Sequence, residues 1–141
     1  MKLLALLPVV ALAWPAAAAA PEAKGKAPAL DVRVIPRMAF SPVNVLVIAE
    51  LKGGDDLEEY YCPEVEFFWD DGGKSVQEAD CPPFEPGTKI ERRYSAEHYY
   101  ERAGNYGVTV ILRRAGKVLR KQTFRLNVRA GLGDPSEVPE D

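Results

Sequence analysis

The chain has 141 residues, 47% of them hydrophobic and 28% charged, and its 18 basic and 21 acidic side chains leave a formal net charge of −3. This length fits one compact domain, since domains most often run to about 100–150 residues. The acidic balance argues against a nucleic-acid binder, and a single His with two Cys excludes a four-ligand zinc site built from Cys and His alone.

Residues 1–20 have the features of a secretory signal peptide. Lys2 supplies a positive charge, residues 3–14 are almost wholly apolar, and residues 15–20 offer small side chains for cleavage. The alternative is a membrane anchor, which needs about 20 apolar residues, and two prolines interrupt this shorter run. We expect cleavage before Ala20, no transmembrane segment afterwards, and a secreted or periplasmic protein. Lys2 is the one charged residue removed, so the mature net charge becomes −4.

Both ends of the mature chain lack the periodicity of helices or strands. Residues 21–30 are rich in Ala, Pro, Gly and Lys, which predicts a flexible linker. Residues 131–141 form an acidic tail with too few apolar side chains to order itself. The folded domain is therefore expected at residues 31–130.

Inside that window the hydrophobic pattern repeats every two residues, which is typical of half-buried strands. Runs of β-branched residues come first, alternating segments follow, and Arg114-Ala-Gly-Lys117 predicts a tight hairpin. We expect strands at 32–35, 45–48, 64–69, 106–113 and 123–129, with a weaker one at 90–98. At 55–61 we expect one or two helical turns capped by an aspartate and ended by Pro63. The predicted fold class is an all-β antiparallel sandwich of about seven strands.

The two cysteines predict one disulfide, because exported proteins meet an oxidising compartment. A Cys62–Cys81 bond would tie the long excursion at 70–87 back to the start of its strand and stabilise the fold by about 3 kcal/mol. Long ordered loops are often functional. Whether this one is, or the bond only offsets loop entropy, stays open at this point.

The segment from His98 to Val110 has the spacing H-x-Y-x-x-x-G-x-Y-x-V-T-[LV], which includes Tyr100, Gly104 and Tyr106. It resembles the end of a PKD domain, an immunoglobulin-like β-sandwich module of extracellular proteins. Residues 68–73, F-W-D-D-G-G, are similar to the family's W-D-F-G-D-G, although the Phe is missing and one acid is shifted. The resemblance spans residues 31–130 and implies a binding or spacer module.

Each matched residue also has a physical reason to be there. Trp69 would bury a large apolar surface between two sheets, and Gly104 would permit a sharp turn into the next strand. The ring of Tyr106 would face inward while its hydroxyl satisfies a backbone group, as in a tyrosine corner. We interpret His98 as a structural hydrogen-bonding residue rather than a catalytic one.

No catalytic residues are predicted. Ser95 and His98 have opposite parity along a strand, and no motif of the G-x-S-x-G type exposes a serine. We therefore expect no enzymatic activity and no cofactor.

Weak calcium candidates flank glycines in two turns, and ordinary solvated turn acids are the favoured alternative. These candidates are Asp55, Asp56, Asp70 and Asp71.

Charge is unevenly distributed along the chain. Residues 50–71 contain nine acids against one Lys, and residues 113–129 contain seven basic residues and no acid. We expect an acidic edge and a basic edge, with Arg113, Arg125 and Arg129 pointing outward in a geometry able to bind a polyanion or an acidic protein region. The favoured alternative is a solvated face that discourages edge-to-edge sheet pairing. Exposed aromatics could form a glycan platform, for which the candidates are Tyr60, Tyr61, Phe68 and Tyr99.

These observations lead to three hypotheses. The leading one is an exported, non-catalytic module that mediates protein–protein or cell-envelope interaction. The second is a carbohydrate-binding module that uses exposed tyrosines. The third is an enzyme accessory or inhibitor protein that presents the Cys62–Cys81 loop. None of them names the partner.

Overall fold

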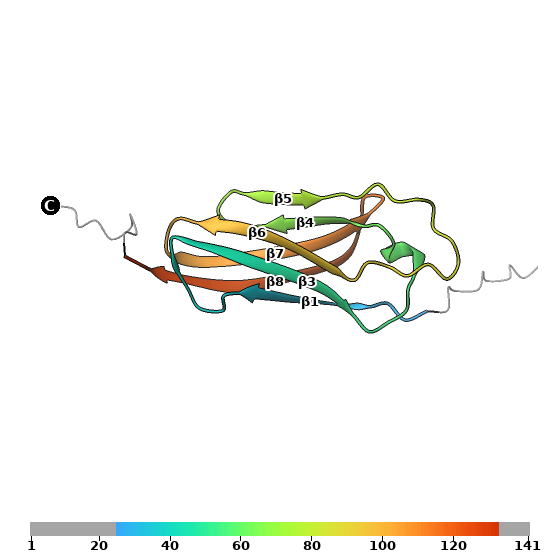
Figure 1. Ribbon diagram of the computed structural model, residues 1–141, viewed down its shortest axis with the longest axis horizontal. Coiled ribbons are helices and arrows are strands. Elements are labelled where there is room, and N and C mark those ends of the chain that lie inside the picture. The colour runs from blue at the N-terminus through green and yellow to red at the C-terminus, as the bar shows by residue number, and fades with distance from the viewer. Residues whose placement is uncertain (1–24, 133–141) are drawn as a thin grey trace, which may run out of the picture.

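The computed structural model describes residues 25–132 (Figure 1). The expected signal peptide, residues 21–24 of the expected linker and most of the acidic tail lie outside these residues. Eight strands and one 3-10 turn are described: β1 (Ala29–Ile35), β2 (Ala39–Ser41), β3 (Val43–Lys52), η1 (Glu58–Tyr60), β4 (Glu64–Phe68), β5 (Lys74–Gln77), β6 (Arg93–Tyr100), β7 (Gly104–Arg114) and β8 (Lys117–Ala130). Among the described residues, no helix has the length and apolar character needed to cross a membrane.

The strands form two sheets, so the all-β prediction is confirmed. A three-stranded sheet has the order β1-β3-β6, and a five-stranded sheet has the order β2-β8-β7-β4-β5. All pairings are antiparallel except that of β2 with the end of β8, which is parallel. In Figure 1 the strands of both sheets run along the long axis of the molecule.

The core lies between the sheets and explains the alternation in the sequence. Successive side chains of a strand point to opposite faces, so every second residue reaches the core. Val45 and Val47 enter it from β3, and Val108 and Val110 from β7, all of them 0% exposed. The two sheets share one cluster of buried residues, as a β-sandwich requires.

Two short edge strands are absent from the sequence-based prediction. β2 has three residues, and its pairing with β8 joins segments about ninety positions apart, which local periodicity does not report. β5 falls inside the expected loop at 70–87, with one apolar residue in Lys-Ser-Val-Gln. Because an edge strand pairs on one side only, β5 is largely exposed and carries little alternation.

The segment at 55–61 differs from the expected capped helix. It forms only the 3-10 turn η1, whose N-cap is Leu57 without a side-chain hydrogen bond. The aspartates are engaged elsewhere: Asp55 accepts the Lys26 backbone N–H at 2.7 Å, and Asp56 pairs with Arg92 at 2.7 Å. Tertiary partners therefore take the carboxylates that would have capped a helix.

β1 begins at Ala29, inside the expected linker. The residues just before it contact the domain, since the carbonyl of Pro28 accepts a hydrogen bond from Arg120 Nε at 2.9 Å.

At the far end of β7, Ala115 and Gly116 form a two-residue hairpin loop, and both have positive φ. Positive φ at both positions is typical of a type I′ turn.

Candidate functional site

The residues of the PKD-like motif form a packed row between the sheets. Trp69 follows β4 and is 1% exposed, and its ring stacks on His98 of β6 with the centroids 4.5 Å apart. His98 contacts the edge of Tyr100, whose ring lies 4.2 Å from that of Tyr106 in β7. Aromatic contacts thus connect both sheets at the end of the molecule where the β4–β5 turn lies.

The polar atoms of this row are also satisfied by the fold. The Tyr100 hydroxyl donates to the Trp69 carbonyl at 2.8 Å, and its burial raises the pKa of that hydroxyl well above its ordinary value. The Tyr106 hydroxyl donates to the Arg102 carbonyl at 2.8 Å, four residues upstream. This is the arrangement of a tyrosine corner.

Gly104 has a different role from the expected one. Its φ is not positive, so no turn conformation requires glycine there. A Cβ at this position would lie 3.1 Å from the ring of Tyr106. Gly104 is therefore needed for space beside the aromatic ring rather than for backbone freedom.

His98 is held by the turn after β4. Its Nε2 donates to Asp71 Oδ2 at 2.6 Å, and Asp71 Oδ1 accepts the Gly73 N–H at 2.9 Å. Partial burial pushes the pKa of Asp71 upward, but the hydrogen bonds from His98 and Gly73 outweigh it, so the pKa lies below the ordinary 3.8. Ser95 lies on the outward parity of β6, away from His98.

The four calcium candidates do not come together. Asp55 and Asp56 lie near η1, whereas Asp70 and Asp71 lie in the β4–β5 turn at the opposite end of the molecule (Figure 1). Asp70 accepts the Gly107 N–H at 2.8 Å, and its own φ is +63°. Within residues 25–132, no three His, Cys, Asp or Glu side chains gather as metal ligands would.

The three candidate tyrosines do not make one platform. Tyr60 is 1% exposed, under the guanidinium of Arg120. Tyr61 packs edge-on against Phe84 and donates its hydroxyl to the Pro82 carbonyl at 2.8 Å. Only Tyr99 is open, at 57%, and it lies on the outer face of the three-stranded sheet. A glycan platform built from these tyrosines is therefore ruled out by the burial of Tyr60 and by their positions.

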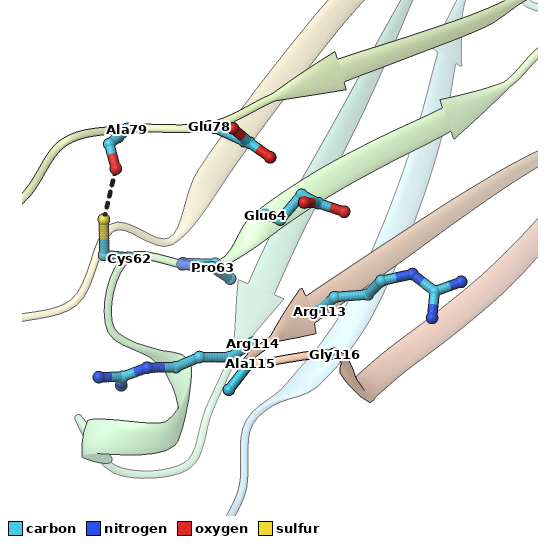
Figure 2. A pocket seen from close by; sticks show the side chains of 9 residues that line it. All are labelled: Cys62, Pro63, Glu64, Glu78, Ala79, Arg113, Arg114, Ala115 and Gly116. Atoms are coloured by element: carbon cyan, nitrogen blue, oxygen red, sulfur yellow. Dashed lines mark hydrogen bonds between the residues drawn. The ribbon is translucent and has the colours of Figure 1, made fainter.

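The Cys62–Cys81 disulfide is confirmed, with its Cα atoms 6.2 Å apart. It closes one side of a hollow of about 290 Å³, whose other walls are the start of β4 and the β7–β8 turn (Figure 2). Glu64 and Glu78 point the same way there, and their hydrogen bond raises the pKa of Glu64. Arg114 points away from them, and its Nη1 is buried with no hydrogen-bond partner among the described residues.

The predicted acidic and basic edges are not separate in the sheet. β4 pairs with β7, which places Glu64 opposite Arg113. Arg113 Nε donates to Glu66 Oε2 at 2.8 Å, and Lys74 Nζ lies 3.7 Å from the other oxygen of Glu66. Arg113 is therefore half-buried and ion-paired. Arg125 and Arg129 are exposed on the outward parity of β8.

The outer face of the five-stranded sheet carries an open groove that sequence reasoning missed. Two hollows of about 620 and 550 Å³ meet at Asp70 and Gly107. Phe68 and Ile111 line the first, and Arg125 and Asn127 the second. Of these, Phe68 and Arg125 were sequence candidates. The cross-strand register that brings them together could not be read from either segment.

Comparison with known proteins adds no relative: no protein-family model matches the chain, and neither a curated protein nor a solved structure matches it.

Proposed function

We propose that the chain is an exported, non-catalytic module of the PKD-like, immunoglobulin-like type that binds a protein or a component of the cell envelope. The strand order supports the fold assignment. If the strands are lettered A, A′, B, C, C′, E, F and G in chain order, the sheets become A-B-E and A′-G-F-C-C′. The immunoglobulin sandwich divides its strands in a similar way.

Trp69 and Tyr106 add support, because they occupy the positions of two features of that fold. Trp69 lies at the end of the strand lettered C, and Tyr106 makes a tyrosine corner at the start of the strand lettered F. The disulfide joins Cys62 to the loop after β5 rather than linking the two sheets. A structural disulfide is typical of oxidising compartments, which favours export.

The observation that carries the binding role is the outer face of the five-stranded sheet. Lys121, Arg125 and Arg129 are exposed along β8, and none of them forms an ion pair with another described residue. In contrast, His98, the side chain best suited to acid–base chemistry, is held between Trp69 and Asp71. Unpaired charge on an open face favours a binding surface.

Site-specific photo-crosslinking in the organism that encodes the chain tests this proposal. The photoreactive residue replaces Thr123, which is exposed on the outer face of the five-stranded sheet. The matched control replaces Ser95, which is exposed on the outer face of the three-stranded sheet. We expect an adduct from position 123 and none from position 95. No adduct from position 123, or equal adducts from both, would contradict a binding role for this face.

A further inference from the structure

The groove exists because one strand ends early and a glycine follows on its neighbour. β4 stops at Phe68, which pairs with Thr109, so β7 continues past it without a β4 partner. The next outward residue of β7 is Gly107, and Arg125 of β8 lies opposite. Without a side chain at Gly107, the two hollows join into one channel along β7 and β8.

The floor of the channel combines apolar and polar groups. Phe68 is half-buried and Ile111 is 7% exposed, although both belong to the outer face of the sheet. Thr109 and Thr123 share a hydroxyl hydrogen bond at 2.9 Å, and Asn127 donates to Asn105 at 2.6 Å. Each hydroxyl and amide retains further capacity to donate or accept. Hollows of this size lie within the range of ligand sites.

The charge that faces the channel is mainly positive. Lys121 borders the first hollow and Arg125 the second, and neither forms an ion pair with a described residue. The acid that lines both hollows, Asp70, already accepts the Gly107 N–H. Lys121 and Arg125 are four positions apart on one strand, so their Cα atoms are about 13 Å apart. A ligand that lies along the channel can therefore reach both side chains at separate points.

Peptides that bind sheets usually add a strand to a free edge through main-chain hydrogen bonds. The channel lies instead on a face, where β7 is paired with β8 along its whole length and with β4 only from Thr109 onward, and where Asp70 accepts the N–H of Gly107. It offers side-chain hydroxyls, amides and cations over an apolar floor. Those groups suit a ligand with many hydroxyls, apolar ring faces and carboxylates.

From this geometry we infer that the channel binds an anionic polysaccharide of the uronate type, with its carboxylates at Lys121 and Arg125 and its rings over Phe68 and Ile111. This inference rests on the proposed binding function and specifies the partner's chemistry. Of the aromatic residues proposed from the sequence as a glycan platform, it keeps Phe68 and leaves out the tyrosines.

The test measures the affinity of the full, processed chain for polygalacturonate by calorimetry at low ionic strength. Methyl-esterified polygalacturonate tests the need for carboxylates, and poly-L-glutamate represents an acidic protein partner. We expect saturable binding to polygalacturonate that is at least about tenfold tighter than to either other polymer. Binding should weaken strongly at about 1 M salt, where the Debye length is about 3 Å.

Two kinds of variant separate charge from shape. The double variant K121A/R125A should weaken binding about tenfold or more. The control R93A removes an exposed arginine of β6 on the other sheet and should leave affinity unchanged.

The variant G107V fills the channel without removing any charge. A Cβ at Gly107 would lie 3.5 Å from Asp70 Oδ2 and 3.7 Å from Thr123 Cγ2, which is ordinary van der Waals contact.

G107V should bind at least about tenfold more weakly, whereas G107A should stay close to wild type. Urea unfolding of each variant establishes that it is folded. Equal affinity of G107V and wild type would overturn the inference, since binding would then depend on charge alone. Preference for poly-L-glutamate would overturn it in favour of an acidic protein. If no polymer binds and crosslinking at position 123 yields a protein adduct, the polysaccharide is wrong and the proposed function stands.

Discussion

At the scale of single residues, the PKD-like motif consists of side chains that satisfy one another. The His98 ring is fixed on one side by stacking on Trp69 and at its Nε2 by Asp71. The sequence pattern predicted a hydrogen-bonding histidine, and His98 does hydrogen-bond to Asp71. What the pattern did not indicate is which carboxylate holds it, because Asp71 reaches His98 across 27 positions of chain.

This contact gives a pH-dependent contribution to stability. The folded pKa of Asp71 is below the unfolded value of 3.8, so its stabilisation is present above pH 3.8 and is lost as the pH falls through the folded pKa. Replacement by Asn should lower the free energy of unfolding by about 1 kcal/mol at pH 7, since the pair is partly solvated. Urea unfolding between pH 2 and pH 7 measures the difference.

The matched control is D80N, which changes an exposed aspartate with no ion pair to a described residue. Its free energy of unfolding should equal that of wild type across the range. A D71N deficit that persists unchanged at pH 2 would show that shape, rather than charge, is what Asp71 contributes.

At the scale of elements, the β7–β8 hairpin was predicted from its local chemistry. Arg114-Ala-Gly-Lys117 forms the two-residue loop, with Ala115 at φ +48° and Gly116 at φ +77°. The left-handed conformation costs an L-residue other than Gly, Asn or Asp roughly 1–2 kcal/mol. Ala115 is thus a locally unfavourable residue in an otherwise favourable turn.

Replacing Ala115 with Asn should therefore raise the free energy of unfolding by about 0.5–1 kcal/mol, because Asn-Gly suits a type I′ turn. Thermal or urea unfolding is the measurement. A79N is a suitable control, since Ala79 is also exposed but has no positive φ. If A79N stabilises the protein as much as A115N does, turn conformation is not the cause.

At the scale of the whole molecule, the disulfide closes a loop that includes an edge strand. Cys62 and Cys81 are 19 positions apart, and both lie outside the strands they flank. The loop they close contains β4, which is paired with β7, and β5, which has only β4 as a partner. In the chain-entropy model, closing a loop of this length stabilises the fold by about 3 kcal/mol.

The double variant C62A/C81A should lose about that much free energy of unfolding while keeping the far-ultraviolet spectrum of a β protein. Wild-type protein reduced with dithiothreitol provides the second measurement, and it should show the same loss. A loss below about 1 kcal/mol in both would mean that contacts such as Tyr61 with Phe84 hold the loop without the bond.

The sequence by itself determined the class of the fold, the inward residues of the long strands and the disulfide. These follow from period-two alternation and from the count of cysteines, which are local or compositional properties. Because side chains alternate along a strand, the apolar Val108 and Val110 of β7 were expected to face the core together, and both are buried. The tyrosine corner was expected for Tyr106 as a residue of the motif that resembles a PKD domain, and its hydroxyl does bond the Arg102 carbonyl.

Only the tertiary structure decided how distant strands pair, and with that the candidate site. The register of β4 with β7 pairs Arg113 with Glu66, so an expected binding residue becomes part of an ion pair. The register of β7 with β8 puts Gly107 opposite Arg125 and opens the channel. Pairing between strands depends on the packing of the whole sandwich, so no single segment encodes it.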